Sequence, residues 1–312
     1  MPRWTDVAEL VRLPAVLTVP GDAALGRAMA GGSGRAMAGG SDRAAALLTA
    51  SSCSVYLAGM ALNDYADRDV DAVERPRRPI PSGRVTPGFA AGLAGALTAA
   101  SLGLAALSGR RALAVAVPLA ATVWAYDLAV KDTPLGPFAM ASARALDVLL
   151  GACHGDLRRA LPAAGVVGGH TLLVTVVSRR EVSGAGPALA RGALGGTAAV
   201  TAAAAAVARG QTAGTTSPAS AGRPGLPARR QVGAVLAAGL LTAHAVSMAG
   251  AELAAIRDPA PARLQRVVAT GVLGLLPLQG AMTAAAGNPA AGALAAAAWP
   301  LARRLARKRS VT

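Results

Sequence analysis

The residues best suited to chemistry lie close together in one short acidic segment. Four aspartates and one asparagine fall between Asn63 and Asp71, in a chain of which only 15% of the residues are charged. If the preceding apolar helix continues through this segment, Asp64, Asp67 and Asp71 share an arc of about 60° on one face. Asp69 points away from that arc. Three carboxylates on one face repel each other unless a cation lies among them, so their hard oxygen atoms predict Mg²⁺ that bridges the protein to a diphosphate.

A basic segment broken by prolines follows directly, and the two segments together resemble a known family. Residues 74–84 are Glu-Arg-Pro-Arg-Arg-Pro-Ile-Pro-Ser-Gly-Arg. This order, after Asn-Asp-x-x-Asp-x-x-x-Asp, resembles the first aspartate-rich motif of the UbiA family of intramembrane prenyltransferases. The positions that match the motif are Asn63, Asp64, Asp67, Asp71, Arg75, Arg78, Pro79, Pro81, Ser82, Gly83 and Arg84. The alternative is a polar loop that carries charge only for solubility, and the combined spacing argues against it.

The resemblance implies a fold, a reaction and a set of contacts. The implied fold is an all-α integral membrane bundle of about nine transmembrane helices around a central cavity. The implied reaction transfers an isoprenyl group from a prenyl diphosphate to a small acceptor, either aromatic or polyol-like. The three motif aspartates would bind Mg²⁺, and Asn63 and Arg78 would contact the diphosphate. Preorganised charge of this kind stabilises a leaving group in a site that excludes water.

A second polar segment contains a tyrosine and a lysine five residues apart. Tyr126-Asp127-Leu128-Ala129-Val130-Lys131 resembles a Tyr-x-x-x-x-Lys segment of the same family, in which the lysine contacts the diphosphate. The compact ammonium of Lys131 suits that role because it neutralises an oxygen without requiring a fixed geometry. The alternative is an ordinary lysine at a helix end, with its stem in lipid and its charge in water.

A third polar segment departs from the family pattern. Where a second Asp-x-x-x-Asp motif is expected, Glu181 is the single carboxylate, and Arg179 and Arg180 stand where acids are expected. One interpretation is that an arginine replaces a second metal ion and binds the diphosphate bidentately. The other is that the protein has lost transfer and serves as a lipid-diphosphate binder or carrier. The order Ser-Arg-x-Glu-Val from residue 178 is similar to a divergent, EboC-like branch of the family from bacterial secondary-metabolism clusters.

Three further charged residues lie within predicted membrane helices, where an ionisable side chain is costly and often functional. Arg12 stands where the first helix of the family carries an arginine that faces the cavity. The alternative for Arg12 is a position near enough to the membrane surface for its guanidinium to reach water. Arg144 and Asp147 lie three residues apart, and they are expected either to form an internal ion pair or to line the cavity.

The composition is that of a membrane protein. Hydrophobic residues make up 53% of the 312 positions, and the mean hydropathy is +0.45. The apolar runs are long enough to cross a hydrocarbon core of about 30 Å, which needs about 20 residues each. The net charge of +15 is scattered among short loops and forms no basic domain, which argues against a nucleic-acid partner and indicates contact with membrane lipid. We expect a multi-pass protein of the cell (plasma) membrane with its site facing the cytoplasm.

The apolar runs also predict the helices and their connections. A single domain is expected over residues 1–312, with flexible loops at 26–43 and 209–230. The first of these loops contains the octet Gly-Arg-Ala-Met-Ala-Gly-Gly-Ser twice in succession. A tenth apolar stretch, 290–302, precedes a basic tail at 303–312, and it either continues the last helix or crosses the bilayer again. The nine predicted helices cover residues 9–26, 44–66, 86–108, 112–129, 135–153, 161–179, 187–208, 231–255 and 267–285.

Overall fold

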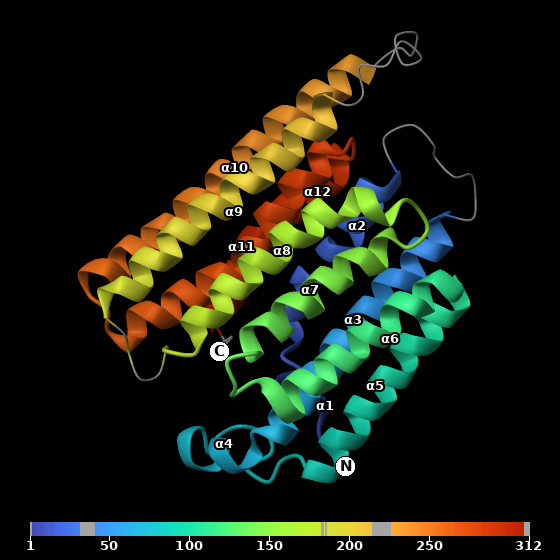
Figure 1. Ribbon diagram of the computed structural model, residues 1–312. Coiled ribbons are helices and arrows are strands. Elements are labelled where there is room, and N and C mark those ends of the chain that lie inside the picture. The colour runs from blue at the N-terminus through green and yellow to red at the C-terminus, as the bar shows by residue number, and fades with distance from the viewer. Residues whose placement is uncertain (1, 32–40, 182–183, 185, 214–225, 309–312) are drawn as a thin grey trace.

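The computed structural model describes residues 2–31, 41–181, 184, 186–213 and 226–308, and the regular structure of these residues is entirely helical (Figure 1). The predicted all-α class is therefore confirmed. The elements in chain order are α1 (Trp4–Leu10), the 3₁₀ turn η1 (Leu13–Thr18), α2 (Pro20–Gly31), α3 (Ser41–Ala66), α4 (Arg68–Glu74), α5 (Pro87–Ser108), α6 (Arg110–Ala125), the π turn η2 (Tyr126–Val130), α7 (Gly136–Ala152), α8 (Leu157–Ser178), α9 (Pro187–Ala213), α10 (Leu226–Arg257), α11 (Pro261–Ala285) and α12 (Pro289–Lys308).

The long helices form two groups that meet along α2, α7 and α8 (Figure 1). In the first group α3 packs against α5, and α5, α6 and α7 follow side by side. In the second group α8, α9, α10 and α12 pack around α11. Buried residues make up 83% of the apolar stretch of α11, against 22% for α5 and for α6. The core of the second group is therefore α11, whereas α5 and α6 present most of their surface outward.

Glycines allow α2 and α7 to approach each other closely. A Cβ atom on Gly26 would lie 1.8 Å from the carbonyl oxygen of Val148, and one on Gly151 would lie 2.3 Å from the carbonyl oxygen of Ala23. Neither position has room for a side chain, so the two backbones are in direct contact. Helices in a membrane depend on such close packing because the surrounding lipid is as apolar as their own side chains. This contact joins the two groups of helices.

The prediction of one first helix over 9–26 is wrong. α1 ends at Leu10, and Arg12 then adopts a left-handed conformation with φ 46° and ψ 50°. The chain continues through η1 into α2, which begins at Pro20. Pro14 and Pro20 explain the interruption, since proline lacks the amide hydrogen of a continuing helix and disfavours a helical conformation in the residue before it.

Two predicted flexible loops are helical at both ends. α2 and α3 extend into the predicted loop 26–43, and α9 and α10 extend into the predicted loop 209–230. Alanine and arginine at these ends have high helix propensity, so the helices continue beyond the apolar runs that predicted them. The remaining parts of these predictions, 32–40 and 214–225, lie outside the described residues.

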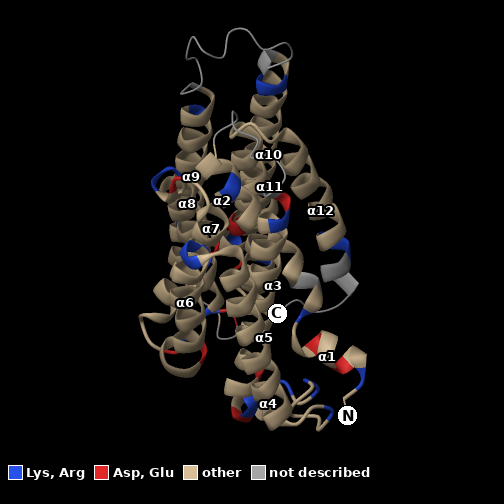
Figure 2. Cartoon of the chain, turned by 90° about the vertical axis from the view of Figure 1, so that its right-hand side faces the viewer, with Lys and Arg blue, Asp and Glu red and all other residues tan. Residues whose placement is uncertain are grey.

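The tenth apolar stretch forms a helix of its own. A turn with Gly287 at φ 91° separates α11 from α12, and glycine adopts this conformation without strain. α12 packs along α11 and runs back toward the end of the bundle where α1 and α4 lie (Figure 2). The predicted basic tail at 303–312 is helical through Lys308, and its last four residues lie outside the described part of the chain.

Six helices of the described chain are long and apolar enough to cross a membrane. Three of the nine predicted segments do not meet both conditions: the first is broken at Arg12, α7 has only 17 residues, and α9 is less apolar. Figure 2 shows uncharged residues along most of the helices and charged residues around α1 and α4. The prediction of a multi-pass membrane protein is confirmed. The six spans are Asp42–Ala66, Pro87–Ser108, Arg110–Val130, Leu157–Ser178, Ala228–Arg257 and Pro261–Ala285.

Candidate active site

The acidic segment lies across the junction of α3 and α4. The predicted helix over 44–66 ends where α3 ends, at Ala66, and Asp67 separates α3 from α4 with φ −87° and ψ 1°. Backbone hydrogen bonds still join the amide of Asp67 to the carbonyl of Asn63, and the amide of Asp71 to the carbonyl of Asp67. These two bonds hold the bend together, and Asp64 and Asp71 remain close enough to share a partner.

That shared partner is Arg78 from the basic segment. Its Nη1 donates to Asp71 Oδ2 at 2.6 Å and to Asp64 Oδ1 at 3.3 Å. Arg75 adds a longer ion pair, with 3.6 Å between its Nη1 and Asp71 Oδ1. Asp64 and Asp71 are only 4% and 1% exposed, and buried carboxylates require a paired positive charge. The basic segment thus folds back over the acidic one and neutralises it.

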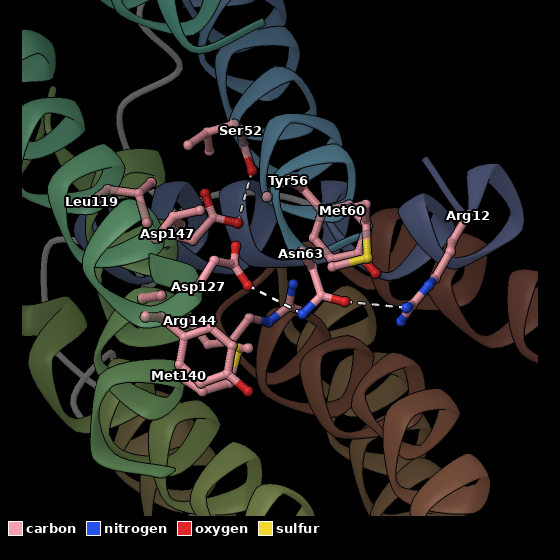
Figure 3. A pocket seen from close by; sticks show the side chains of 15 residues that line it. Arg12, Ser52, Tyr56, Met60, Asn63, Leu119, Asp127, Met140, Arg144 and Asp147 are labelled. Atoms are coloured by element: carbon pink, nitrogen blue, oxygen red, sulfur yellow. Dashed lines mark hydrogen bonds between the residues drawn. The ribbon is translucent and has the colours of Figure 1, made fainter. Parts of the chain in front are cut away.

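Arg12 reaches the same cluster from the break between α1 and α2. Its Nη2 lies 3.2 Å from Asn63 Oδ1 and 3.2 Å from Asp64 Oδ1. Asn63 in turn donates from Nδ2 to Asp127 Oδ1 at 3.2 Å, and Figure 3 shows this chain of three side chains. The interruption of the first helix therefore has a consequence for the site, because it directs Arg12 toward α3 and into the cavity wall.

The second polar segment forms a π turn beside this cluster. The amide of Lys131 donates to the carbonyl of Tyr126 at 2.9 Å, and π turns of this kind often occur at functional sites. The ammonium of Lys131 forms an ion pair with Asp67. Tyr126 and the buried Asp127 line the cavity. Sequence reasoning assigned no role to Asp127, although its position next to Tyr126 in a polar segment was an available signal.

The third polar segment packs against the second through Arg179. Its Nη2 donates to the carbonyl oxygen of Asp132 at 3.1 Å, and its Nη1 donates to the carbonyl oxygen of Thr133. In the structure the Arg179 guanidinium therefore holds the loop that follows Lys131. It makes these contacts with backbone carbonyls rather than with a carboxylate of the acidic segment.

Arg180 and Glu181 follow at the end of α8. Arg180 is exposed. Glu181 Oε2 is buried and has no hydrogen-bond partner among the described residues. Burial raises the pKa of Glu181 above its ordinary value, and the charges of Arg75 and Arg12 oppose this shift. The three polar segments therefore lie together at one end of the bundle.

The basic segment is attached to α1 through Arg84. The Arg84 guanidinium donates to both carboxylate oxygens of Glu9, at 2.7 and 2.9 Å, and to Asp6 Oδ1 at 2.7 Å. Hydrogen bonds to Glu9 and Asp6 raise the pKa of Arg84 above its ordinary value. The adjacent Gly83 has φ 75°, which only glycine adopts without strain. The end of the basic segment thus positions the loop, while Arg78 contacts the aspartates.

A cavity of about 190 Å³ lies behind the acidic segment, between α3, α6 and α7 (Figure 3). Its outer end is lined by Arg12, Asn63 and Asp127, and its inner end by Ser52, Arg144 and Asp147. All of its lining residues precede α8, so the predicted cavity belongs to the first group of helices rather than to the centre of the whole bundle. The apolar side chains of its middle part are Val55, Met60, Leu119, Val123, Met140 and Ala143.

Arg144 and Asp147 both line this cavity, but each has a different partner. Arg144 Nη2 lies 2.9 Å from Asp22 Oδ2, and Asp147 Oδ2 accepts a hydrogen bond from Ser52 Oγ at 2.8 Å. Of the two alternatives drawn from the sequence, lining of the cavity is therefore the one observed. Asp22 was missed, although a carboxylate within an apolar membrane segment is itself a signal of a functional or paired site.

The donor set of the acidic segment suits Mg²⁺. Asp64, Asp67 and Asp71 offer carboxylate oxygens and Asn63 offers an amide oxygen, which are the hard ligands that this ion prefers. Basic side chains compensate these carboxylates in the structure, and no three acidic, histidine or cysteine side chains of the described chain already surround one point. Binding of Mg²⁺ therefore requires the aspartates to exchange basic partners for the ion.

The apolar helices, the acidic segment with its basic partners and the cavity behind it define a polytopic α-helical membrane protein with a charged site at one end of the bundle. The model of the UbiA prenyltransferase family matches residues 24–310. The chain therefore belongs to the UbiA prenyltransferase family, and the resemblance carried by the acidic and basic segments is confirmed.

Part of the chain is similar in sequence to digeranylgeranylglyceryl phosphate synthases. It is 42% identical over 91 residues to the synthase of Methanopyrus kandleri and 33% identical over 134 residues to that of Natronomonas pharaonis. These stretches cover 29% and 43% of this chain. They cover 34% and 46% of the two synthases, so the chain spans less than half the length of the curated relatives it matches.

Solved structures of UbiA homologs share the fold. The homolog from Aeropyrum pernix has a TM-score of 0.57 at 20% identity, covering 86% of this chain and 96% of that one. A homolog from Archaeoglobus fulgidus, bound to DMAPP and Mg²⁺, has a TM-score of 0.54 at 13% identity, covering 88% of this chain and 98% of that one. At these identities the likeness establishes the arrangement of the helices alone.

Proposed function

We propose that this protein is a Mg²⁺-dependent membrane prenyltransferase that transfers an isoprenyl group from a prenyl diphosphate to a small aromatic or polyol-like acceptor. One observation carries the proposal. Each of the three motif aspartates is paired with a basic side chain, and the cluster stands at the outer end of a cavity with apolar walls. Such a site suits an anionic diphosphate held beside an apolar space from which water is excluded.

The charges of the site divide into two sets with different tasks. Asp64, Asp67 and Asp71, assisted by Asn63, would hold Mg²⁺. Bound there, the ion would neutralise the diphosphate and stabilise it as a leaving group. The basic side chains released from the aspartates would then face the diphosphate oxygens. The guanidinium groups suit bidentate contact with those oxygens, and the ammonium of Lys131 can follow the negative charge without a fixed geometry.

The substrate head group is proposed to contact further residues around the outer end of the cavity. These are Arg12, Tyr126 and the third polar segment, with Arg179, Arg180 and Glu181. Arg12 and Tyr126 line the cavity, and Glu181 carries a buried carboxylate oxygen near the charges of Arg12 and Arg75. Apolar walls behind them would exclude water from the reacting carbon. Exclusion of water strengthens every charge interaction in the site and protects a carbocation from hydrolysis.

Relatives support a prenyl diphosphate as the donor. One solved structure with this fold shows a homolog from Archaeoglobus fulgidus bound to DMAPP and Mg²⁺, and a second, also of a homolog from that organism, contains GPP and Mg²⁺. The relatives with partial sequence matches are digeranylgeranylglyceryl phosphate synthases. We infer that the donor of this protein also belongs to the prenyl diphosphates. Membership of the EboC-like branch stays a prediction that rests on the third polar segment.

We place the site at the cytoplasmic face of the cell membrane. The basic segment 74–84 and the two arginines that end α8 lie at the same end as the acidic segment, and α12 carries its basic C-terminal turns back toward that end. Arginine and lysine near membrane helices favour the cytoplasmic side. Labelling of single cysteines introduced at Arg77 and at Arg110, in intact cells, would test this orientation.

A second candidate function is binding or carriage of a lipid diphosphate without transfer. The observation that favours it is Arg179, whose guanidinium is engaged with the carbonyls of Asp132 and Thr133 and does not stand in for a second metal ion in the structure. In that case the protein would bind a prenyl diphosphate with Mg²⁺ and release no free diphosphate.

Diphosphate release distinguishes the transferase from the carrier. It is measured with purified protein, geranylgeranyl diphosphate, Mg²⁺ and a panel of aromatic and cyclitol acceptors. We expect acceptor-dependent release that falls about 100-fold or more in Asp67→Ala. Asp69→Ala is the matched control, because Asp69 is exposed and its side chain pairs only with Arg68 among the described residues. Loss of release in Arg180→Ala would assign a substrate contact to Arg180. Mg²⁺-dependent binding without release for any acceptor would favour the carrier.

A further inference from the structure

The inner end of the cavity is polar although it lies deep among the membrane helices. Ser52 and Asn63 line opposite ends of the cavity from the same helix, α3, and their separation by eleven positions corresponds to about 16 Å. From the facing helix α7, Asp147 lies beside Ser52 (Figure 3), and Arg144, three residues earlier, lines the same cavity. Two polar ends are therefore separated by an apolar middle.

The charges at this inner end are only partly compensated within the protein. Arg144 Nη2 lies 2.9 Å from Asp22 Oδ2, and Asp22 Oδ1 accepts a hydrogen bond from Gln279 Nε2 at 2.6 Å. Arg144 and Asp22 thus form a supported ion pair. Asp147 has the neutral hydroxyl of Ser52 as its hydrogen-bond partner at 2.8 Å. Asp22 and Asp147 are also neighbours, and the charge of Arg144 acts on both, so one arginine serves two carboxyl groups at this end.

Four polar atoms at the inner end have no hydrogen-bond partner among the described residues. Arg144 Nη2 and Asp22 Oδ2 face each other in the ion pair, which leaves Asp147 Oδ1, an acceptor, and Arg144 Nε, a donor. Asp147 is 5% exposed and Arg144 is 8% exposed, and both side chains line the cavity. Buried polar groups are nearly always hydrogen-bonded, and ionisable groups within a membrane generally mark a site. A ligand group that both donates and accepts would satisfy both atoms.

We propose that the inner end of this cavity binds a hydroxyl group of the acceptor molecule, and this inference rests on the proposed function. A hydroxyl donates to Asp147 Oδ1 and accepts from Arg144 Nε. An ammonium group would meet the positive charge of Arg144 and could accept nothing from it. The end of a prenyl chain would leave both atoms unpaired. The hydroxyl is therefore a recognition group, and it holds the acceptor behind the diphosphate site.

The size of the cavity indicates a single ring. An apolar cavity of about 150 Å³ binds benzene, and this one has about 190 Å³. Tyr56, Met60 and Met140 form part of its middle, and thioether sulfur packs well against aromatic rings. A hydroxylated aromatic ring fits this combination of volume, walls and inner end.

Binding of two small probes to purified protein in lipid nanodiscs tests the assignment. The probes are 4-fluorophenol and 4-fluorotoluene, which differ by hydroxyl against methyl, and ¹⁹F NMR titration gives both affinities after subtraction of protein-free nanodiscs. We expect 4-fluorophenol to bind about 10- to 100-fold more tightly, the range for a hydrogen bond to a charged group. Asp147→Asn should remove most of that preference and leave 4-fluorotoluene binding unchanged within about twofold. Equal affinity of the two probes for the unaltered protein would overturn the assignment.

Two controls locate the binding and test the fold. Asp156→Asn makes the same substitution outside the cavity, at the residue whose side chain accepts the amide hydrogen of Arg158, and it should change neither affinity. Met140→Trp fills the apolar middle of the cavity and should weaken the binding of both probes to a similar extent. If 4-fluorophenol still binds normally to Met140→Trp, the probe sits elsewhere and the assignment fails. These readings decide the question even if Asp147→Asn does not fold.

The probe titration needs no diphosphate and no turnover, so its result is independent of the proposed reaction. Hydroxyl-selective binding without diphosphate release would contradict the transferase proposal and leave the hydroxyl site standing. Diphosphate release without hydroxyl-selective binding would support the transferase and contradict the hydroxyl site. An increase in geranylgeranyl diphosphate affinity in Asp147→Asn would also overturn the assignment, because it would show that the inner end receives the prenyl tail.

Discussion

The guanidinium of Arg78 donates to Asp71 across 2.6 Å, and the same nitrogen lies 3.3 Å from Asp64. A single positive group thus holds together two buried carboxylates that belong to different helices, one on α3 and one on α4. The basic segment is therefore a part of the acidic site rather than a connection between helices. The acidic and basic segments therefore depend on each other for their folded conformation.

Substitution Arg78→Gln should destabilise the metal-free protein by about 3 kcal/mol, because it leaves buried carboxylates without their main partner. Mg²⁺ should raise the melting temperature of this variant more than that of the unaltered protein, since the ion can occupy the vacated position. Thermal unfolding in EDTA and in Mg²⁺ measures both effects. Arg77→Gln, at the exposed neighbouring position, should behave like the unaltered protein. Identical Mg²⁺ responses in the two variants would contradict the bridging role.

Two substitutions at Arg12 distinguish the contribution of its side-chain contacts to stability from the cost of its backbone conformation. Both Arg12→Ala and Arg12→Gly remove the contacts to Asn63 and Asp64, but only glycine relieves the left-handed backbone at φ 46°. We expect the alanine variant to be about 1 kcal/mol less stable than the glycine variant. Chemical unfolding of the purified variants in detergent measures the difference. A more stable alanine variant would mean that the break after α1 is not left-handed in solution.

The close contact of α2 with α7 predicts a sharp difference between two glycine substitutions. Gly26→Ala would place a Cβ atom 1.8 Å from the carbonyl of Val148, and we expect it to cost about 2 kcal/mol or more. Gly192 lies within α9 with no neighbouring atom within 4 Å of an added Cβ. Gly192→Ala should therefore stabilise the protein by about 0.5–1 kcal/mol. Melting temperatures that move in the same direction for both variants would argue against the α2–α7 contact.

The attachment of the basic segment to α1 should be visible in hydrogen exchange. Arg84→Ala removes hydrogen bonds to Glu9 and Asp6, so amides of residues 75–86 should exchange faster while those of α7 are unaffected. The cost in global stability should be about 1 kcal/mol or less, because Arg84 and Glu9 are partly exposed and solvent screens the pair. Unchanged exchange at 75–86 would show that other contacts hold the loop.

Much of the fold follows from local features of the chain. Apolar runs predicted the long helices because hydropathy and helix propensity act over a few neighbouring residues. The prolines at 14 and 20 carried the information about the broken first helix, but the prediction gave more weight to the apolar run around them. The C-terminal ends of α9 and α12 were missed because both helices continue through polar residues, arginine among them, where hydrophobicity has already fallen.

The sequence by itself also determined the acidic and basic segments, since the order of their residues identifies the family and brings Arg78 to Asp71 through a short connection. Tertiary structure alone decided which distant charges meet: Asn63 with Asp127, Arg179 with the carbonyl of Asp132, and Arg144 with Asp22 rather than with its neighbour Asp147. The physical reason is that such pairs depend on the rotation and register of one helix against another. Those quantities arise from close packing between helices, as at Gly26, and the periodicity of a single helix does not contain them.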